Sequence, residues 1–213
     1  MWIRCLRETK KNIMAYRDFT FSDLYTKFGI EQSRKKLFDK IVSQTPSDLL
    51  LAFLDTASDA ALSTEKAVSE ALVYPILQEI RLRNRSELKL FSGENLLGDK
   101  SKGLNGECDF ILSKSPKTLD LGAPIINITE AKQGDIENLK SQSQAAAQLL
   151  GARLFNEHHG ITTNTIYGAC TSGFTWVFLK LENNEIVIDS DRYSTSNLPQ
   201  LLGVLQTIID LSK

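Results

Sequence analysis

Three charged residues near the middle of the 213-residue chain have the types and spacing that metal-dependent phosphodiester chemistry requires. Asp109 lies early in one apolar segment, and Glu130 and Lys132 lie two positions apart at the end of the next. Two carboxylates can share one hard divalent cation, such as Mg²⁺ or Mn²⁺. A lysine beside them can steady a water molecule or the charge on a phosphate. The pattern indicates a nuclease-type site.

The acid-x-lysine tripeptide alone is weak, because the chain contains it at 8–10, 87–89 and 130–132. About one or two copies are expected from ordinary charged-residue usage. Only the third copy ends a β-rich apolar run and follows a partner acid on a preceding run. A structural alternative is an ion pair at a sheet edge, with Asp109 capping a turn. Acids inside apolar strands are costly unless they are paired or bind a metal, which favours the site.

Strand alternation indicates how these side chains meet. It predicts that Glu130 and Lys132 lie on the same face as Ile126 and Ile128. If the two strands pair, Asp109 approaches Glu130 and both carboxylates can bind one cation. The metal would lower the pKa of a bound water, and Lys132 would stabilise charge on the phosphate.

The helices on either side of these strands carry further polar candidates. Glu70 lies within one turn of an apolar stripe, so it is expected to project toward the sheet as a third carboxylate. The alternative is an ion pair of Glu70 with Lys66 or Arg81. Gln144 and Gln148 are four residues apart at the edge of the next apolar stripe, where their amides could position the lysine or a phosphate. Most polar residues at such an edge have no special role.

The hydrophobic period predicts an α/β (α+β) fold. Residues 1–60 are expected to form an all-helical N-terminal extension, with N-caps at Thr20 and Ser47, packed on a core formed by 61–213. A helix at 63–84 is expected to bend at Pro75. Further along, the pattern predicts a glycine-rich loop after the first strand, and a last helix that begins after Asn197. The other expected elements are strands at 87–91, 107–112 and 124–132, a helix at 135–156, and strands at 165–170, 175–181 and 185–188.

Composition excludes several classes of protein. A net charge of −1, with 42% hydrophobic and 24% charged residues, is unlike that of proteins that coat nucleic acid by bulk charge. No apolar run approaches the ~20 residues that cross a bilayer, and the start lacks a secretory signal, so a cytoplasmic protein is expected. Cys5, Cys108 and Cys170 have no zinc or disulfide spacing and are interpreted as reduced thiols.

Three other motifs are interpreted as structural. Residues 93–101 resemble a P-loop, but an extra Asp99 precedes the lysine, which favours a connecting loop. His158 and His159 follow a helix end, where capping outweighs metal ligation. Trp176 and Phe178 are expected in the core.

The order of the candidates along the chain resembles that of the PD-(D/E)XK nuclease superfamily. A helix with Glu70, a strand, a strand with Asp109, a strand with 130–132, and a helix with Gln144 and Gln148 reproduce its αβββαβ core, a mixed sheet flanked by helices. Segments 64–66, 70–77, 130–132 and 144–156 are more narrowly similar to bacterial, many of them cyanobacterial, restriction-endonuclease-like proteins of unassigned role. That similarity spans about 20–210. Cys108 replaces the proline of the family name, at a position that varies widely.

The resemblance implies a role for each matching residue. Asp109, Glu130 and the carbonyl of Ala131 would be ligands of Mg²⁺ or Mn²⁺, Lys132 the catalytic lysine, and Glu70 an auxiliary acid. The expected substrate is nucleic acid, in particular DNA. A non-catalytic module that binds nucleic acid or protein, and an accessory subunit of a restriction or repair system, are the alternatives. A homodimer and a partner subunit both stay open.

Overall fold

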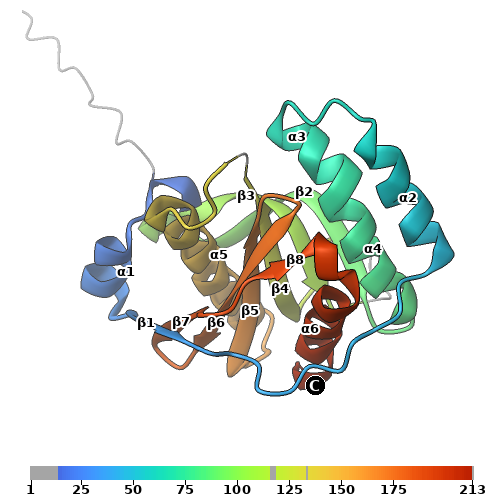
Figure 1. Cartoon of the computed structure of the whole chain (residues 1–213). Helices are drawn as coiled ribbons and strands as arrows, with labels where there is room; N and C mark the ends of the chain where they lie inside the picture. Colours follow the sequence, from blue (N-terminus) through green and yellow to red (C-terminus); the bar gives the residue numbers. More distant parts are fainter. Residues whose placement is uncertain (1–13, 116–118, 133, 213) are drawn as a thin grey trace, which may run out of the picture.

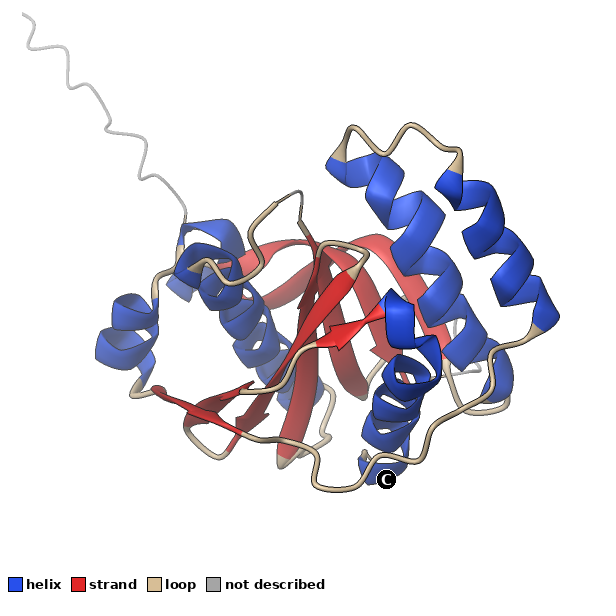
Figure 2. Ribbon diagram, viewed as in Figure 1, coloured by secondary structure: helices blue, strands red, loops and turns tan. Residues whose placement is uncertain are grey.

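The computed structural model describes residues 14–115, 119–132 and 134–212, which form one mixed sheet with helices on both faces (Figures 1 and 2). The strand order is β1-β7-β6-β5-β4-β3-β2, and β8 pairs with β6. The β1–β7 and β4–β5 pairs are parallel and the other pairs antiparallel. The main elements are α1 (Phe21–Phe28), β1 (Glu31–Lys35), α2 (Asp48–Ser58), α3 (Glu65–Val68), α4 (Tyr74–Arg83), β2 (Lys89–Asp99), β3 (Leu104–Ser113), β4 (Ile125–Ala131), α5 (Leu139–His158), β5 (Thr165–Thr171), β6 (Thr175–Glu182), β7 (Glu185–Asp189), β8 (Tyr193–Ser194) and α6 (Leu198–Leu211).

Two apolar clusters fill the space between the sheet and its helices. One packs α2, α4 and α6 on one face, and the other packs α1 and α5 on the opposite face. Trp176 and Phe178 of β6 are fully buried, which confirms the core placement predicted for them. The sheet is therefore covered on both sides, and the ends of its central strands are held in place by packed helices.

The N-terminal region was predicted to be all-helical, but its described part also contains a β-strand. The predicted caps are present, because Thr20 and Ser47 accept backbone hydrogen bonds at the starts of α1 and α2. Between these helices, β1 pairs in parallel with β7 and extends the sheet by one edge strand. The sequence of β1, Glu31–Lys35, is entirely polar, so it has no apolar alternation. Its strand conformation depends on main-chain pairing with β7.

The helix predicted at 63–84 is continuous but irregular. It consists of α3, a π-helical turn η2 (Ser69–Val73) and α4. The Tyr74 N–H donates to the Ser69 carbonyl, which closes the wide turn directly before Pro75. A proline cannot donate in a regular α-helical turn, so the widened turn absorbs the disturbance predicted for this position.

The loop predicted between the first two strands is instead a long hairpin. β2 continues through Gly93 and Gly98 to Asp99, and a short 3-10 turn η3 (Lys100–Lys102) leads into β3. The P-loop-like segment is therefore mostly strand. Glycines obscure a strand pattern in the sequence because they have no side chain to alternate.

A β-bulge in β4 changes the predicted face of one residue. Across β3, Leu112 pairs with Asn127 but Ser113 pairs with Ile125, so Ile126 is the extra residue. Ile126 accordingly packs in the α4–α6 cluster, whereas Ile128 packs in the α5 cluster. The prediction that both isoleucines share the face of Glu130 is wrong for Ile126.

Candidate functional site

The β3–β4 register places the two predicted carboxylates side by side. Phe110 pairs with Thr129 in these antiparallel strands, so Asp109 and Glu130 occupy the next cross-strand position. Ile128, two residues before Glu130, lies in the cluster beneath α5. Alternation therefore turns Glu130 toward α5, at the end of β4.

Glu130 is the centre of a buried hydrogen-bond network. Only 3% of the residue is exposed. Its Oε1 accepts from Lys132 Nζ at 2.6 Å and from the amide of Gln144, and its Oε2 accepts from Gln148 Nε2 at 2.7 Å. Burial raises the pKa of Glu130, and the positive charge of Lys132 opposes that effect. The four-residue spacing of the two glutamines on α5 brings both to this carboxylate, whereas the sequence predicted that they would position the lysine or a phosphate.

Lys132 is held as a cation by its surroundings. Burial alone would lower its pKa, but the nearby charge of Glu130 and the hydrogen bond to it outweigh burial and raise the pKa. The side chain remains 19% exposed beside a carboxylate that is 3% exposed. A positive charge therefore lies at the mouth of the site.

Asp109 is held against the strand that carries Glu130. Its Oδ2 accepts a hydrogen bond from the Ala131 N–H at 2.8 Å. Burial and then the charge of Glu130 raise the pKa of Asp109 to about 7, although the Ala131 hydrogen bond and Lys132 oppose the rise. Asp109 and Glu130 thus lie close together with Lys132 as their nearby cation. Two neighbouring carboxylates with raised pKa values are typical of functional sites.

The auxiliary acid predicted from the sequence, Glu70, lies at the solvent edge of the site, where it lines a neighbouring cleft together with Asp109 and Phe110 of β3. The Glu70 side chain is 69% exposed and lies 3.8 Å from Lys66, which is the ion pair considered as the alternative. Glu65, five residues earlier, instead contributes negative charge to Asp109, Glu130 and Lys132. Glu70 lies within the π turn, whose wider register regular periodicity could not reveal. Sequence reasoning therefore missed Glu65.

The charged residues line one open cleft of about 400 Å³. Its walls include Asp109, Glu130, Lys132 and Gln144, together with Glu65 and, from the short 3-10 turn η1 (Tyr16–Asp18), Arg17. The cleft thus gathers residues from both helical layers and from the ends of β3 and β4.

The oxygen atoms in this cleft could supply some of the ligands of a hard cation. Glu130 Oε2 and Asp109 Oδ2 each accept one hydrogen bond from the described residues, and a carboxylate oxygen can accept two. The Gln148 Oε1 atom is buried, with no hydrogen-bond partner among the described residues. No group of three or more His, Cys, Asp or Glu residues that could hold a metal is found in the described ranges. A bound cation would therefore need ligands besides the two carboxylates, such as waters or the Ala131 carbonyl.

Asp109→Asn is expected to stabilise the metal-free protein by about 2 kcal/mol at pH 8, after allowance for screening by solvent. An asparagine Oδ1 can still accept from Ala131, and it removes the repulsion from Glu130. The folded pKa is about 7 and the ordinary value 3.8, so wild-type stability falls as pH rises between them. The gain should therefore vanish below about pH 4. Denaturant unfolding in EDTA at several pH values measures it, with Glu107→Gln on the same strand as the control. A gain that is equal at pH 4 and pH 8 would contradict this account.

The remaining sequence motifs have structural roles. His159 contacts the Phe155 carbonyl at the end of α5 through its backbone N–H and its Nδ1, which agrees with the predicted capping. Cys108 and Cys170 are buried free thiols, and burial raises the pKa of both. Cys5 lies outside the described residues.

No family model matches the chain, and no curated protein matches it. Within the described residues, no helix is both long enough and apolar enough to cross a membrane. The chemistry of the cleft is therefore what separates one function from another.

Proposed function

We propose that the protein is a metal-dependent nuclease that hydrolyses phosphodiester bonds, in particular those of DNA. The observation that carries the proposal is the cross-strand pair of Asp109 and Glu130, with Lys132 bonded to Glu130 in the same cleft. Carboxylates with raised pKa values beside a retained cation suit metal-assisted hydrolysis better than a purely structural ion pair.

The order of elements supports membership of the PD-(D/E)XK superfamily as part of this proposal. The helix α3–α4 is followed by β2, β3 and β4, then by α5 and β5, which corresponds to the αβββαβ order. Asp109 lies on the second of these strands and 130–132 at the end of the third. Gln144 and Gln148 on the following helix contact Glu130 directly.

Each residue has a distinct role in the proposed reaction. Asp109, Glu130 and the Ala131 carbonyl would hold Mg²⁺ or Mn²⁺. The metal, when bound, polarises the phosphate and lowers the pKa of a water molecule. Lys132 offsets negative charge that develops on the phosphate, while Gln148 and Gln144 orient the carboxylate of Glu130. Glu65, which lines the cleft, joins Glu70 as a proposed auxiliary acid.

A non-catalytic binding module or accessory subunit is the second candidate, and one observation favours it. Lys132 and Gln144 both donate to Glu130 Oε1 and fill its acceptor capacity. That carboxylate is therefore already neutralised from within the chain. Metal binding must compete with this network, so metal affinity separates the two candidates.

Mg²⁺ is expected to raise the melting temperature of the wild type by about 5 to 10 °C at a hundredfold excess over its Kd, because only the folded chain joins the two carboxylates. Glu130→Gln should show almost no rise. Differential scanning fluorimetry measures both, and plasmid and single-stranded DNA are then tested for cleavage with Mg²⁺, Mn²⁺ or EDTA.

The outcomes separate the two candidates. Metal-dependent cleavage that Glu130→Gln abolishes is the result expected of the nuclease. A rise in melting temperature without cleavage of either DNA would favour the binding module. Cleavage that persists in EDTA would show that the proposed metal site is not the source of activity.

A further inference from the structure

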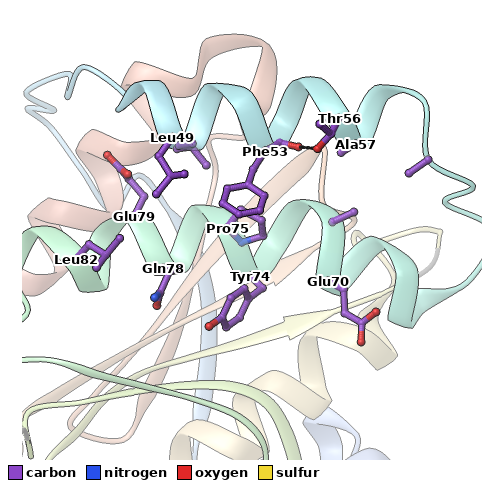
Figure 3. A pocket seen from close by; sticks show the side chains of 13 residues that line it. Leu49, Phe53, Thr56, Ala57, Glu70, Tyr74, Pro75, Gln78, Glu79 and Leu82 are labelled. Carbon is purple, nitrogen blue, oxygen red and sulfur yellow. Dashed lines mark hydrogen bonds between the residues drawn. The ribbon is translucent and has the colours of Figure 1, made fainter.

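An apolar groove runs between α2 and α4, on the side of the molecule that carries these two helices (Figures 1 and 3). It has a volume of about 360 Å³. Leu49 and Phe53 of α2 form one wall, and Tyr74, Pro75 and Leu82 line the other. Figure 3 shows Leu49 and Phe53 directed from the upper helix toward the lower one.

Helix α2 has apolar side chains on its exposed surface in addition to those that it buries in the core. Leu50 and Ala57 form the stripe that is buried in the core. Leu49 and Phe53, four residues apart, form a second stripe with 56% and 53% exposure. Exposed apolar rows of this kind mark interaction sites.

The shape of the groove fits a helix. Its lining residues extend from 49 to 57 on α2, with Ala60 just beyond the end of that helix, and from 70 to 82 on η2 and α4. At 1.5 Å per residue, the walls are about 12 and 18 Å long, or two to three helical turns. Anchors at four-residue spacing on both walls match the ridges of a third helix, whereas a single nucleobase would fill only one part of the length.

The charges on α2 indicate which kind of helix would bind in the groove. Helix α2, Asp48–Ser58, contains no lysine or arginine. The helical period places Asp48, Asp55 and the C-cap residue Asp59 in a row on the solvent side of α2, about a third of a turn from the exposed stripe, and all three are exposed. Glu70 lies at the end of the groove, where Lys66 offsets its charge. This acidic row repels nucleic acid and also an identical groove of a second copy.

We propose that this groove binds a basic amphipathic helix of a partner protein. Apolar side chains of that helix occupy the space between Phe53 and Tyr74, and its lysines or arginines lie against the row of aspartates. The mode is helix-in-groove recognition, in which apolar anchors supply affinity and rim charges supply orientation. The inference does not depend on the proposed nuclease activity.

The test uses a synthetic amphipathic peptide of about four helical turns, with leucines on one face and lysines on the other, and its glutamate counterpart. The full chain should bind the lysine peptide and bind the glutamate peptide at least about tenfold more weakly. Phe53→Asp should weaken binding of the lysine peptide by at least about tenfold. Leu51→Asp is the matched control, because Leu51 is also exposed on α2 but does not line the groove.

Fluorescence anisotropy measures binding, and circular dichroism confirms that each variant is folded. Equal binding of both peptides, or equal loss in Phe53→Asp and Leu51→Asp, would overturn the proposal. Sedimentation of the wild type tests the competing occupant. A dimer that Phe53→Asp dissociates and Leu51→Asp preserves would assign the groove to a second copy. Binding of a DNA oligonucleotide that Phe53→Asp alone abolishes would assign it to nucleic acid and likewise overturn the proposal.

Discussion

Lys132→Met is expected to lower the rate of metal-dependent DNA cleavage by about 10²–10³-fold, the loss typical when one charge-stabilising group is removed from an active site. Lys132 Nζ lies 2.6 Å from Glu130 Oε1, and the side chain is partly exposed in the cleft. Methionine keeps most of the apolar stem and removes the charge. Single-turnover cleavage of plasmid DNA measures the chemical step separately from product release.

The same substitution should not abolish Mg²⁺ binding. In the wild type, Lys132 competes with a cation for Glu130, so its removal frees an oxygen of that carboxylate. We therefore expect Lys132→Met to keep or enlarge the Mg²⁺-dependent rise in melting temperature. Loss of both cleavage and the rise would indicate that Lys132 supports the fold of the site instead of the reaction.

Lys180 offers a matched control elsewhere in the sheet. It also lies two residues from a glutamate on a strand, and its Nζ is 3.0 Å from Glu182 Oε2. Lys180 does not line the cleft. Lys180→Met should leave cleavage within about twofold of the wild type, because a partly exposed ion pair contributes little. Equal losses in the two variants would contradict a specific role for Lys132.

Much of the site could be predicted because the sequence shows both the two-residue period of strands and the helical spacing of four residues. Strand alternation and the order of the strands placed Asp109 near Glu130, and the register of β3 and β4 confirms that they are cross-strand neighbours. The four-residue spacing of Gln144 and Gln148 likewise indicated one face of a helix, and both contact Glu130. These features follow from local geometry alone.

The errors occur where a local irregularity or a tertiary contact overrides the period. Glu70 lies within the π turn before Pro75 and lines a neighbouring cleft, whereas Glu65 lines the cleft of Glu130. One extra residue in β4 turns Ile126 to the other face. The polar strand β1 has no apolar pattern and exists because β7 offers backbone partners. Gly98 interrupts the pattern of β2 for a reason that only the packed structure reveals.

Gly98→Val is expected to destabilise the protein by about 3 kcal/mol, which corresponds to a melting temperature about 6–12 °C lower. A Cβ atom at Gly98 would lie 2.6 Å from the Cα atom and 2.8 Å from the carbonyl oxygen of Gly151 on α5. Both contacts are to backbone, so no rotamer change relieves them. Because valine is otherwise favourable in a strand, the loss measures the helix–strand contact itself. Thermal unfolding by circular dichroism gives the value.

Leu97→Val on the same strand is the control, since Leu97 is 55% exposed and the change should cost less than about 0.5 kcal/mol. The helix displaced by Gly98→Val also carries Gln144 and Gln148, one to two turns before Gly151. Cleavage should therefore fall in Gly98→Val even at a temperature where it is fully folded. Unfolding temperatures that coincide for the two variants would show that α5 does not depend on this contact, and that its glutamines are held at Glu130 by other means.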